Sequence, residues 1–147
     1  MPGETDLDTL IRCMRPELRG DVCVFVTLPR GVPVPKGLAP IMSFNEAEGI
    51  TLIMREDLAR RAGLRGAYPC RMITLNVQSN LSAVGFLARI TARLAEAGIS
   101  VNPVSAFHHD HLFVTTDRAD EAMGILRRMS EEAPISLRSP DHQSISA

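Results

Sequence analysis

The chain has 147 residues, a net charge of −1 and an apolar fraction of 45%. That apolar fraction supplies a globular core and excludes a disordered chain, while the near-neutral charge gives no electrostatic case for a nucleic-acid or membrane partner. No apolar run approaches the ~20 residues that cross a bilayer, and the N-terminus lacks the basic and apolar regions of a signal peptide. We therefore expect a cytoplasmic protein that contacts neither nucleic acid nor membrane.

The first part of the chain predicts a helix, a buried strand and a surface connection. Apolar residues recur at three- and four-residue spacing over residues 6–18, which is typical of a short helix. Residues 22–28 form a continuous apolar run, which favours a strand buried on both faces. Residues 29–40 hold four prolines and two glycines, so this segment must be a surface connection instead of a helix or a central strand.

A hairpin and a second short helix follow. Residues 41–54 contain two β-prone runs joined by a polar turn, in which Gly49 can supply a positive φ. Residues 55–62 predict a short helix, and Gly63 is placed to end it. Residues 64–69 then form a linker to the second half of the chain.

The second half carries the clearest local signals. Residues 71–78 predict a β-branched strand, and residues 81–97 predict a long amphipathic helix. Residues 99–107 and residues 112–115 predict two further strands joined by a polar turn. Residues 117–129 predict the last helix. This order of elements is one strand short of a split βαβ sandwich.

Both long helices have one apolar face. At 100° per residue, the apolar positions of the first long helix fall within about a third of its circumference. The apolar positions of the last helix also lie on one side. Two helices on one face leave the other face of the sheet to be covered by the first half or by a second copy of the chain. The expected inward residues are Val84, Leu87, Ala88, Thr91, Leu94 and Ala95 in the first helix and Ala119, Ala122, Met123, Leu126 and Met129 in the last.

Residues 84–101 resemble the first-helix signature of the ACT domain, the small-molecule sensing module of amino-acid metabolism. The residues that stand where this signature requires them are Gly85, Gly98 and Ile99. The chain departs from the signature at two positions, with Ser82 in place of aspartate and Val84 in place of proline. The whole chain is most similar to a group of small bacterial proteins with two ACT-like halves, and the likeness is carried by residues 72–75, 83–85 and 109–114.

The resemblance implies an α+β fold: a ferredoxin-like, βαββαβ-type ACT sandwich whose two ACT-like halves place helices over antiparallel sheets. It implies an N-terminal degraded ACT-like half over residues 1–66 and an ACT domain over residues 67–132. Residues 133–147 are rich in serine and proline, which predicts a mobile C-terminal tail. Because ACT-like sheets tend to pair and a short chain has little surface to cover its own sheet, we expect a homodimer.

The loop at residues 78–85 is the favoured ligand site. It leaves a strand and enters the first turn of the long helix, whose free N–H groups attract anions such as an α-carboxylate. Gly85 has no side chain, so a ligand could approach that turn closely. In the ACT family this loop binds effector amino acids together with backbone atoms of the next strand of a neighbouring domain. The expected ligand-binding residues are therefore Gln78, Ser79, Asn80, Ser82, Val84, Gly85, Asn102, Val104 and Ser105.

A plainer interpretation of this loop stays open, and so does a second site. A serine or asparagine of the loop can simply cap the helix, and Gly85 can simply allow close packing. Residues 108–111 hold three histidines and an aspartate, which are ligands for zinc or iron. Because neighbouring side chains of a strand point to opposite faces, at most two of these four can meet at one metal ion. We therefore expect a structural turn unless a second chain or His142 completes the site.

Other catalytic and metal signatures are missing from the sequence. The three widely spaced cysteines form no C-x-x-C pair, which predicts buried reduced thiols instead of a zinc site or a disulfide. No nucleophile elbow, phosphate-binding glycine motif or paired-carboxylate pattern occurs. We therefore expect no enzyme and no cofactor, but a regulatory module of amino-acid metabolism that binds an amino acid or a related carboxylate. The alternatives are a metal-dependent enzyme that uses residues 108–111 and a ligand-free protein interaction module.

Overall fold

The computed structural model describes residues 3–135, so most of the predicted mobile tail lies outside the described residues. The helices are α1 (Leu7–Cys13), α2 (Glu56–Arg61), α3 (Phe86–Glu96) and α4 (Ala119–Glu132). The strands are β1 (Pro16–Leu18), β2 (Cys23–Pro29), β3 (Met42–Asn45), β4 (Gly49–Arg55), β5 (Ala67–Leu75), β6 (Asn102–Ser105) and β7 (Asp110–Thr115).

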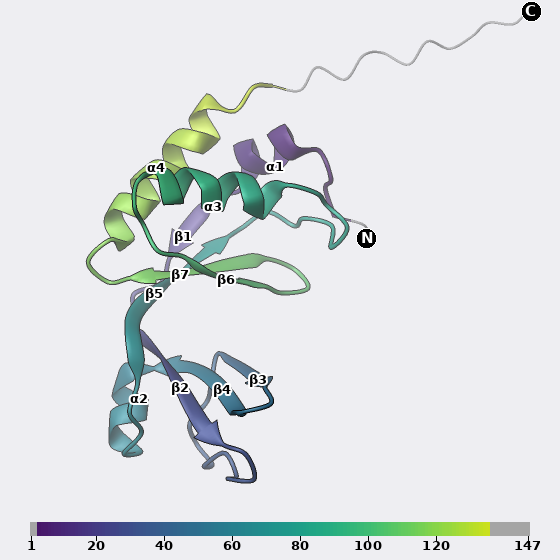
Figure 1. The fold of residues 1–147 in the computed structure, drawn as a ribbon. Coiled ribbons are helices and arrows are strands. Elements are labelled where there is room, and N and C mark those ends of the chain that lie inside the picture. The colour runs from purple at the N-terminus through teal and green to yellow at the C-terminus, as the bar shows by residue number, and fades with distance from the viewer. Residues whose placement is uncertain (1–2, 136–147) are drawn as a thin grey trace, which may run out of the picture.

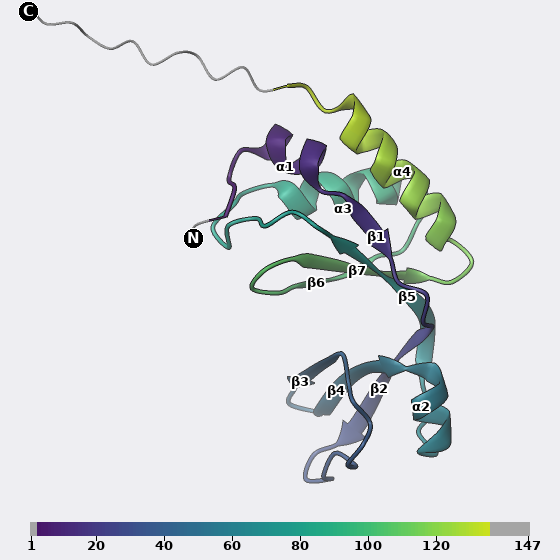
Figure 2. The same ribbon diagram turned by 180° about the vertical axis from the view of Figure 1, so that it is seen from behind.

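Within residues 3–135 the strands form one seven-stranded antiparallel sheet in the order β3-β4-β2-β5-β7-β6, with β1 beside β5. Figure 1 and Figure 2 show that the sheet is strongly curled and that β5 runs through both of its parts. The helices α1, α3 and α4 cover one face of the part formed by β1, β5, β7 and β6, while α2 lies beside β2 and β4. This arrangement confirms the predicted α+β fold with helices over an antiparallel sheet.

The N-terminal helix and strand pack against the second half of the chain. The helix predicted over residues 6–18 ends at Cys13, because Pro16 has no N–H group and disfavours helical geometry at Arg15, whose φ is 40°. Residues 16–18 form β1 instead, antiparallel to the end of β5. Three side chains from this N-terminal segment are buried in the core under the helices: Leu10, Ile11 and Met14.

Helix α3 begins later than the predicted start at residue 81. The first predicted turn is replaced by a non-helical turn, in which Asn80 Oδ1 accepts a hydrogen bond at 2.8 Å from the N–H group two residues on. Gly85 then has a φ of 92°, in the left-handed region, so the regular helix starts at Phe86. The helix therefore turns a different face to the core than predicted. Its buried residues are Phe86, Ile90 and Leu94, whereas Val84, Ala88 and Ala95 are exposed.

Helix α4 and the hairpin of β3 and β4 form where the sequence predicts them. The predicted inward residues of α4 are all buried: Ala119, Ala122, Met123, Leu126 and Met129. Gly49 does not adopt the positive φ expected of it. The glycine is needed for a different reason, because an added Cβ would come within 2.1 Å of the Leu28 carbonyl oxygen on the neighbouring strand β2.

Three apolar clusters hold the fold together. The first lies between the sheet and α1, α3 and α4, and the second packs α2 against β2 and β4. The third lies on the opposite face of the sheet, where the Phe25 ring contacts Tyr68 and Phe113 edge to face, with ring centroids 5.8 and 6.0 Å apart. Residues of both halves thus meet on the face that the helices leave open. The expected boundary between residues 66 and 67 stays a prediction.

The cysteines differ in their exposure. Cys23 and Cys70 are free and buried, as predicted, whereas Cys13 is free and exposed. The exposure of Cys13 arises because α1 turns the side that carries Leu10 and Ile11 toward the core. Within residues 3–135, no helix combines the length and the apolar character needed to span a membrane.

Candidate functional site

The loop between β5 and α3 is held by the start of the chain, which lies beside it in Figure 1. The Glu4 N–H group donates to the Gln78 carbonyl at 2.9 Å, and the Asn80 N–H group donates to the Glu4 carbonyl at 3.0 Å. Gly3 lies against the same backbone, where an added Cβ would come within 2.6 Å of the Ser79 carbonyl carbon. These contacts fix the backbone of the loop.

A pocket of about 160 Å³ opens between this loop, the start of α3 and the hairpin of β6 and β7. Its volume is below the ~300–1,000 Å³ of pockets for drug-sized ligands, so it suits a small molecule. Four of the expected site residues line it, namely Ser79, Asn80, Gly85 and Ser105. The other lining residues are Leu81, Ala83, Phe86, Leu87, Ala88, Ala106 and Asp110.

The remaining five expected site residues do not line this pocket in the described chain. Gln78, Ser82 and Val84 are exposed in the loop. Val104 packs into the cluster on the opposite face of the sheet, and Asn102 is exposed on β6. Because side chains alternate along a strand, β6 presents its two sets of side chains to opposite faces, and Ser105 belongs to the set that faces the pocket.

The first turn of α3 supplies hydrogen-bond donors to the pocket. The first hydrogen bond of the helix runs from the Arg89 N–H group to the Gly85 carbonyl at 2.9 Å. The preceding N–H groups, those of Phe86, Leu87 and Ala88, have no acceptor within the helix, and all three residues line the pocket. Together with the helix dipole, these groups give the wall a partial positive charge that favours an anion.

Asp110, which the sequence suggests only as a metal ligand, places a carboxylate in the same pocket. It is 7% exposed and begins β7. Within residues 3–135 its side-chain hydrogen-bond partner is the Ser79 hydroxyl, which donates to Oδ2 at 3.4 Å. Burying a carboxylate with so few hydrogen bonds raises the free energy of the folded protein. An ammonium group bound in the pocket would lower that free energy by pairing with the carboxylate. Its alternation with the buried Leu112 and Val114 is the sequence signal that could have placed it on this face.

The histidines of the hairpin do not join Asp110 in the pocket. His111 lies on the opposite face of β7, with Nδ1 3.0 Å from the Thr74 hydroxyl oxygen. Burial, followed by the nearby His109, lowers the His111 pKa below its ordinary value, although Asp110 opposes the shift. His109 Nδ1 is buried without a hydrogen-bond partner among residues 3–135. No three potential metal ligands meet within the described residues, and His142 lies outside them.

Comparison with known proteins places both halves of the chain in one family. An ACT-domain family model matches residues 2–71, and a second ACT-domain model matches residues 67–128. No curated protein matches the chain. A solved structure from Vibrio cholerae, a protein of unknown function described as a possible transport protein, is 37% identical with a TM-score of 0.76. That match covers 84% of this chain and 95% of the other.

More distant structures share the fold. A protein from Agrobacterium tumefaciens is 16% identical with a TM-score of 0.64, over 78% of this chain and 87% of its own. The ligand-free regulatory subunit of aspartate kinase from Thermus thermophilus is 11% identical with a TM-score of 0.60, over 78% of this chain and 96% of its own. Because both halves match the same domain and the Vibrio cholerae protein is similar over most of its length, this chain belongs to the ACT-domain family and consists of two ACT-like halves.

Proposed function

We propose that this protein is a regulatory module that binds an amino acid, or a related small carboxylate, in the pocket at the start of α3. One observation carries the proposal: the N–H groups that begin α3 and the buried carboxylate of Asp110 line the same small pocket. An α-amino acid carries the two complementary groups, a carboxylate for the helix end and an ammonium group for Asp110. The hydroxyl groups of Ser79 and Ser105 add further hydrogen-bonding partners.

The comparisons support the regulatory part of the proposal. Both halves match the ACT domain, and regulatory subunits of aspartate kinase from two Thermus species share the fold. The protein would then act without catalysis, through a change of shape or of contacts when the ligand binds. Such a change requires the ligand to bind one conformation more tightly than another.

A second copy of the chain completes the proposed site. Strand β6 ends the sheet within residues 3–135, so its outer backbone groups are available to a partner. Backbone atoms of Asn102 and Val104 on this strand could reach the ligand loop of a neighbouring protomer, which accounts for expected site residues that lie away from the pocket of their own chain. The proposed unit is a cytoplasmic homodimer.

A thermal-shift screen of the standard amino acids and their 2-oxo acids tests the proposal, followed by calorimetry on the compound that raises Tm most. Asp110→Asn keeps the shape of the side chain and removes the charge that would bind the ammonium group. We expect the affinity for the amino acid to fall at least tenfold, which corresponds to about 1.4 kcal/mol. A 2-oxo acid has no ammonium group and its carboxylate is repelled by Asp110, so its affinity for the variant should equal or exceed its affinity for the wild type.

Asp117→Asn is the matched control, because Asp117 is exposed and lies outside the pocket. Its affinity for the amino acid should equal that of the wild type. If Asp110→Asn also binds like the wild type, the ligand site lies elsewhere. If no compound raises Tm, the ligand-free interaction module becomes the better interpretation.

A further inference from the structure

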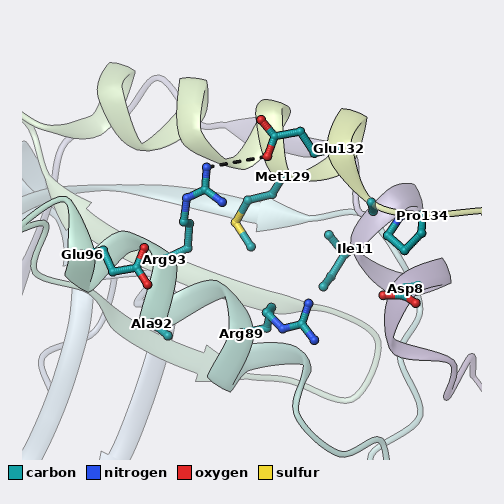
Figure 3. Close-up of a pocket in the computed structure, with 10 residues that line it drawn as sticks. Asp8, Ile11, Arg89, Ala92, Arg93, Glu96, Met129, Glu132 and Pro134 are labelled. Carbon is teal, nitrogen blue, oxygen red and sulfur yellow. Dashed lines mark ion pairs between the residues drawn. The ribbon is translucent and has the colours of Figure 1, made fainter.

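A second pocket lies in the helix layer, between α1, α3 and α4. It has a volume of about 290 Å³ and is lined by residues of α1, α3 and α4 and of the turn after α4. Figure 3 shows side chains from all three helices directed into it. The proposed function does not use this pocket.

The floor of the helix-layer pocket is apolar and held in place. Ile11 from α1 and Met129 from α4 are 4% and 6% exposed, and both point into the pocket in Figure 3. The Ser130 hydroxyl donates to the Arg12 carbonyl at 2.6 Å, which ties α4 to α1 beside the pocket. Because its walls are packed helices, the pocket is formed before any ligand arrives.

The rim of the pocket carries charges of both signs, and some of them form no ion pair among residues 3–135. Arg93 is already engaged, with Nη2 3.7 Å from a carboxylate oxygen of Glu132. Arg89 is one turn earlier on α3, and within residues 3–135 it forms no ion pair; nor does Asp8 on α1. Figure 3 shows Arg89 and Asp8 at the same end of the pocket. Because neither charge forms an ion pair among the described residues, both are available to a molecule that carries a carboxylate and an ammonium group.

We propose that the helix-layer pocket binds a small zwitterion with a compact apolar side chain. Its carboxylate would be held by Arg89, its ammonium group by Asp8, and its side chain by the apolar surface of Ile11 and Met129. Exposed ion pairs each contribute little to affinity, so the ligand needs both charges and the apolar contact together. Simple anions and simple amines carry only one of the two charges, so they should bind this pocket more weakly than a zwitterion. The proposal stands independently of the ligand at the start of α3.

The test follows the ε-methyl NMR signal of Met129 in protein labelled with ¹³C-methyl methionine, while L-valine is added. Isovalerate has the same apolar part and carboxylate without the ammonium group, and isobutylamine has the ammonium group without the carboxylate. We expect a saturable shift of the Met129 signal with L-valine, and roughly two- to fivefold weaker binding of either half-molecule. Equal binding of L-valine and isovalerate would overturn the zwitterion assignment.

Three variants test whether the Met129 signal reports binding in the helix-layer pocket. Arg89→Met keeps an unbranched apolar stem and removes the charge, so L-valine should bind roughly two- to fivefold more weakly, whereas Arg127→Met on the exposed side of α4 should bind like the wild type. Asp110→Asn should leave the Met129 titration unchanged, because Asp110 lines only the other pocket. An unchanged titration in Arg89→Met, or no saturable shift of Met129 in the wild type, refutes the helix-layer site without bearing on the first one.

Discussion

The conformation of Gly85 decides how α3 presents its first turn to the ligand pocket. Its φ of 92° lies in the left-handed region, which costs a residue with a Cβ roughly 1–2 kcal/mol. Space is not the constraint, because an added Cβ would meet nothing nearer than Leu7 Cδ2 at 3.7 Å. The glycine is therefore required for its backbone geometry.

Gly85→Ala should lower the free energy of unfolding by roughly 1–2 kcal/mol through this strain alone. Gly85→Asp should do the same and should also abolish ligand binding, because its carboxylate would occupy the wall that attracts the ligand's carboxylate. Urea denaturation measures the first effect and calorimetry the second. Gly20→Ala is the control, since Gly20 has no positive φ and nothing within 4 Å of an added Cβ. Equal stability of the two alanine variants would contradict the assigned strain.

The buried thiol of Cys70 predicts a loss of stability at alkaline pH. Burial, with a smaller effect from Cys23, raises the Cys70 pKa to about 12 from its ordinary value of 9.0. Above about pH 9 the unfolded chain loses this proton while the native state keeps it, so the free energy of unfolding should fall as the pH rises from about 9 to about 12. Urea denaturation at about pH 8 and about pH 10 should show a smaller loss in Cys70→Ala than in the wild type. Cys13→Ala, at an exposed thiol, should match the wild type.

At the scale of elements, backbone hydrogen bonds from the N-terminal segment hold the ligand loop in place. Gly3→Ala should break the backbone hydrogen bonds between Glu4 and the loop, because the new Cβ would lie 2.6 Å from the Ser79 carbonyl carbon. We expect faster hydrogen exchange at the Asn80 N–H group and weaker ligand binding, with the core intact. Gly20→Ala again serves as the control. An unchanged rate of hydrogen exchange at the Asn80 N–H group would show that these hydrogen bonds contribute nothing to the order of the loop.

Elements with a continuous pattern could be predicted from the sequence, and elements decided by single backbone angles could not. Helix α4 has an uninterrupted apolar stripe, and its inward residues follow from that stripe. The sequence predicts too early a start for helix α3, because Ser79 and Asn80 suit a helix cap as well as the turn that Asn80 forms. Strand β1 is only three residues long, too short for periodicity to reveal.

Part of the candidate site could be predicted from the sequence, and part of it could not. The loop could be predicted because a glycine and small polar residues follow a strand, although the helix after it begins later than the sequence predicts. The position of Asp110 could not be predicted, because its polar neighbours are typical of a turn. In the structure it is the first residue of β7, so its side chain lies on the face that strand alternation gives it. Val104 and Ser105 are adjacent in the sequence, and the structure sends them to opposite faces of the sheet.

At the scale of the whole molecule, the sheet of residues 3–135 leaves each of its two end strands with an unpaired edge. Strand β3 ends it on one side and β6 on the other. Large apolar side chains are exposed near each, with Phe44 on β3 62% exposed and Phe107 after β6 70% exposed. Open edges flanked by exposed apolar residues favour association with a second copy.

Light scattering at micromolar concentration should therefore show a homodimer. Phe44→Glu and Phe107→Glu place a charge at the two edges in turn, and the variant that becomes monomeric identifies the edge that pairs. We expect Phe107→Glu to have the larger effect, because the proposed site needs a partner at β6. A wild-type protein that is a clean monomer contradicts both the dimer and the role of Asn102 and Val104.

The hydrogen bond from Ser130 to the Arg12 carbonyl joins α4 to α1 across 118 positions of the chain. During synthesis, α1 emerges from the ribosome before the strands of the sheet, and its packing partner α4 emerges after all of them. The cluster of β2, β4 and α2 has all its members before residue 65 and can assemble while synthesis continues. A chain that stops before α4 would thus carry a formed first half and an N-terminal helix with its apolar side uncovered. Such a truncated product should be held by chaperones and degraded, although most of its sequence is present.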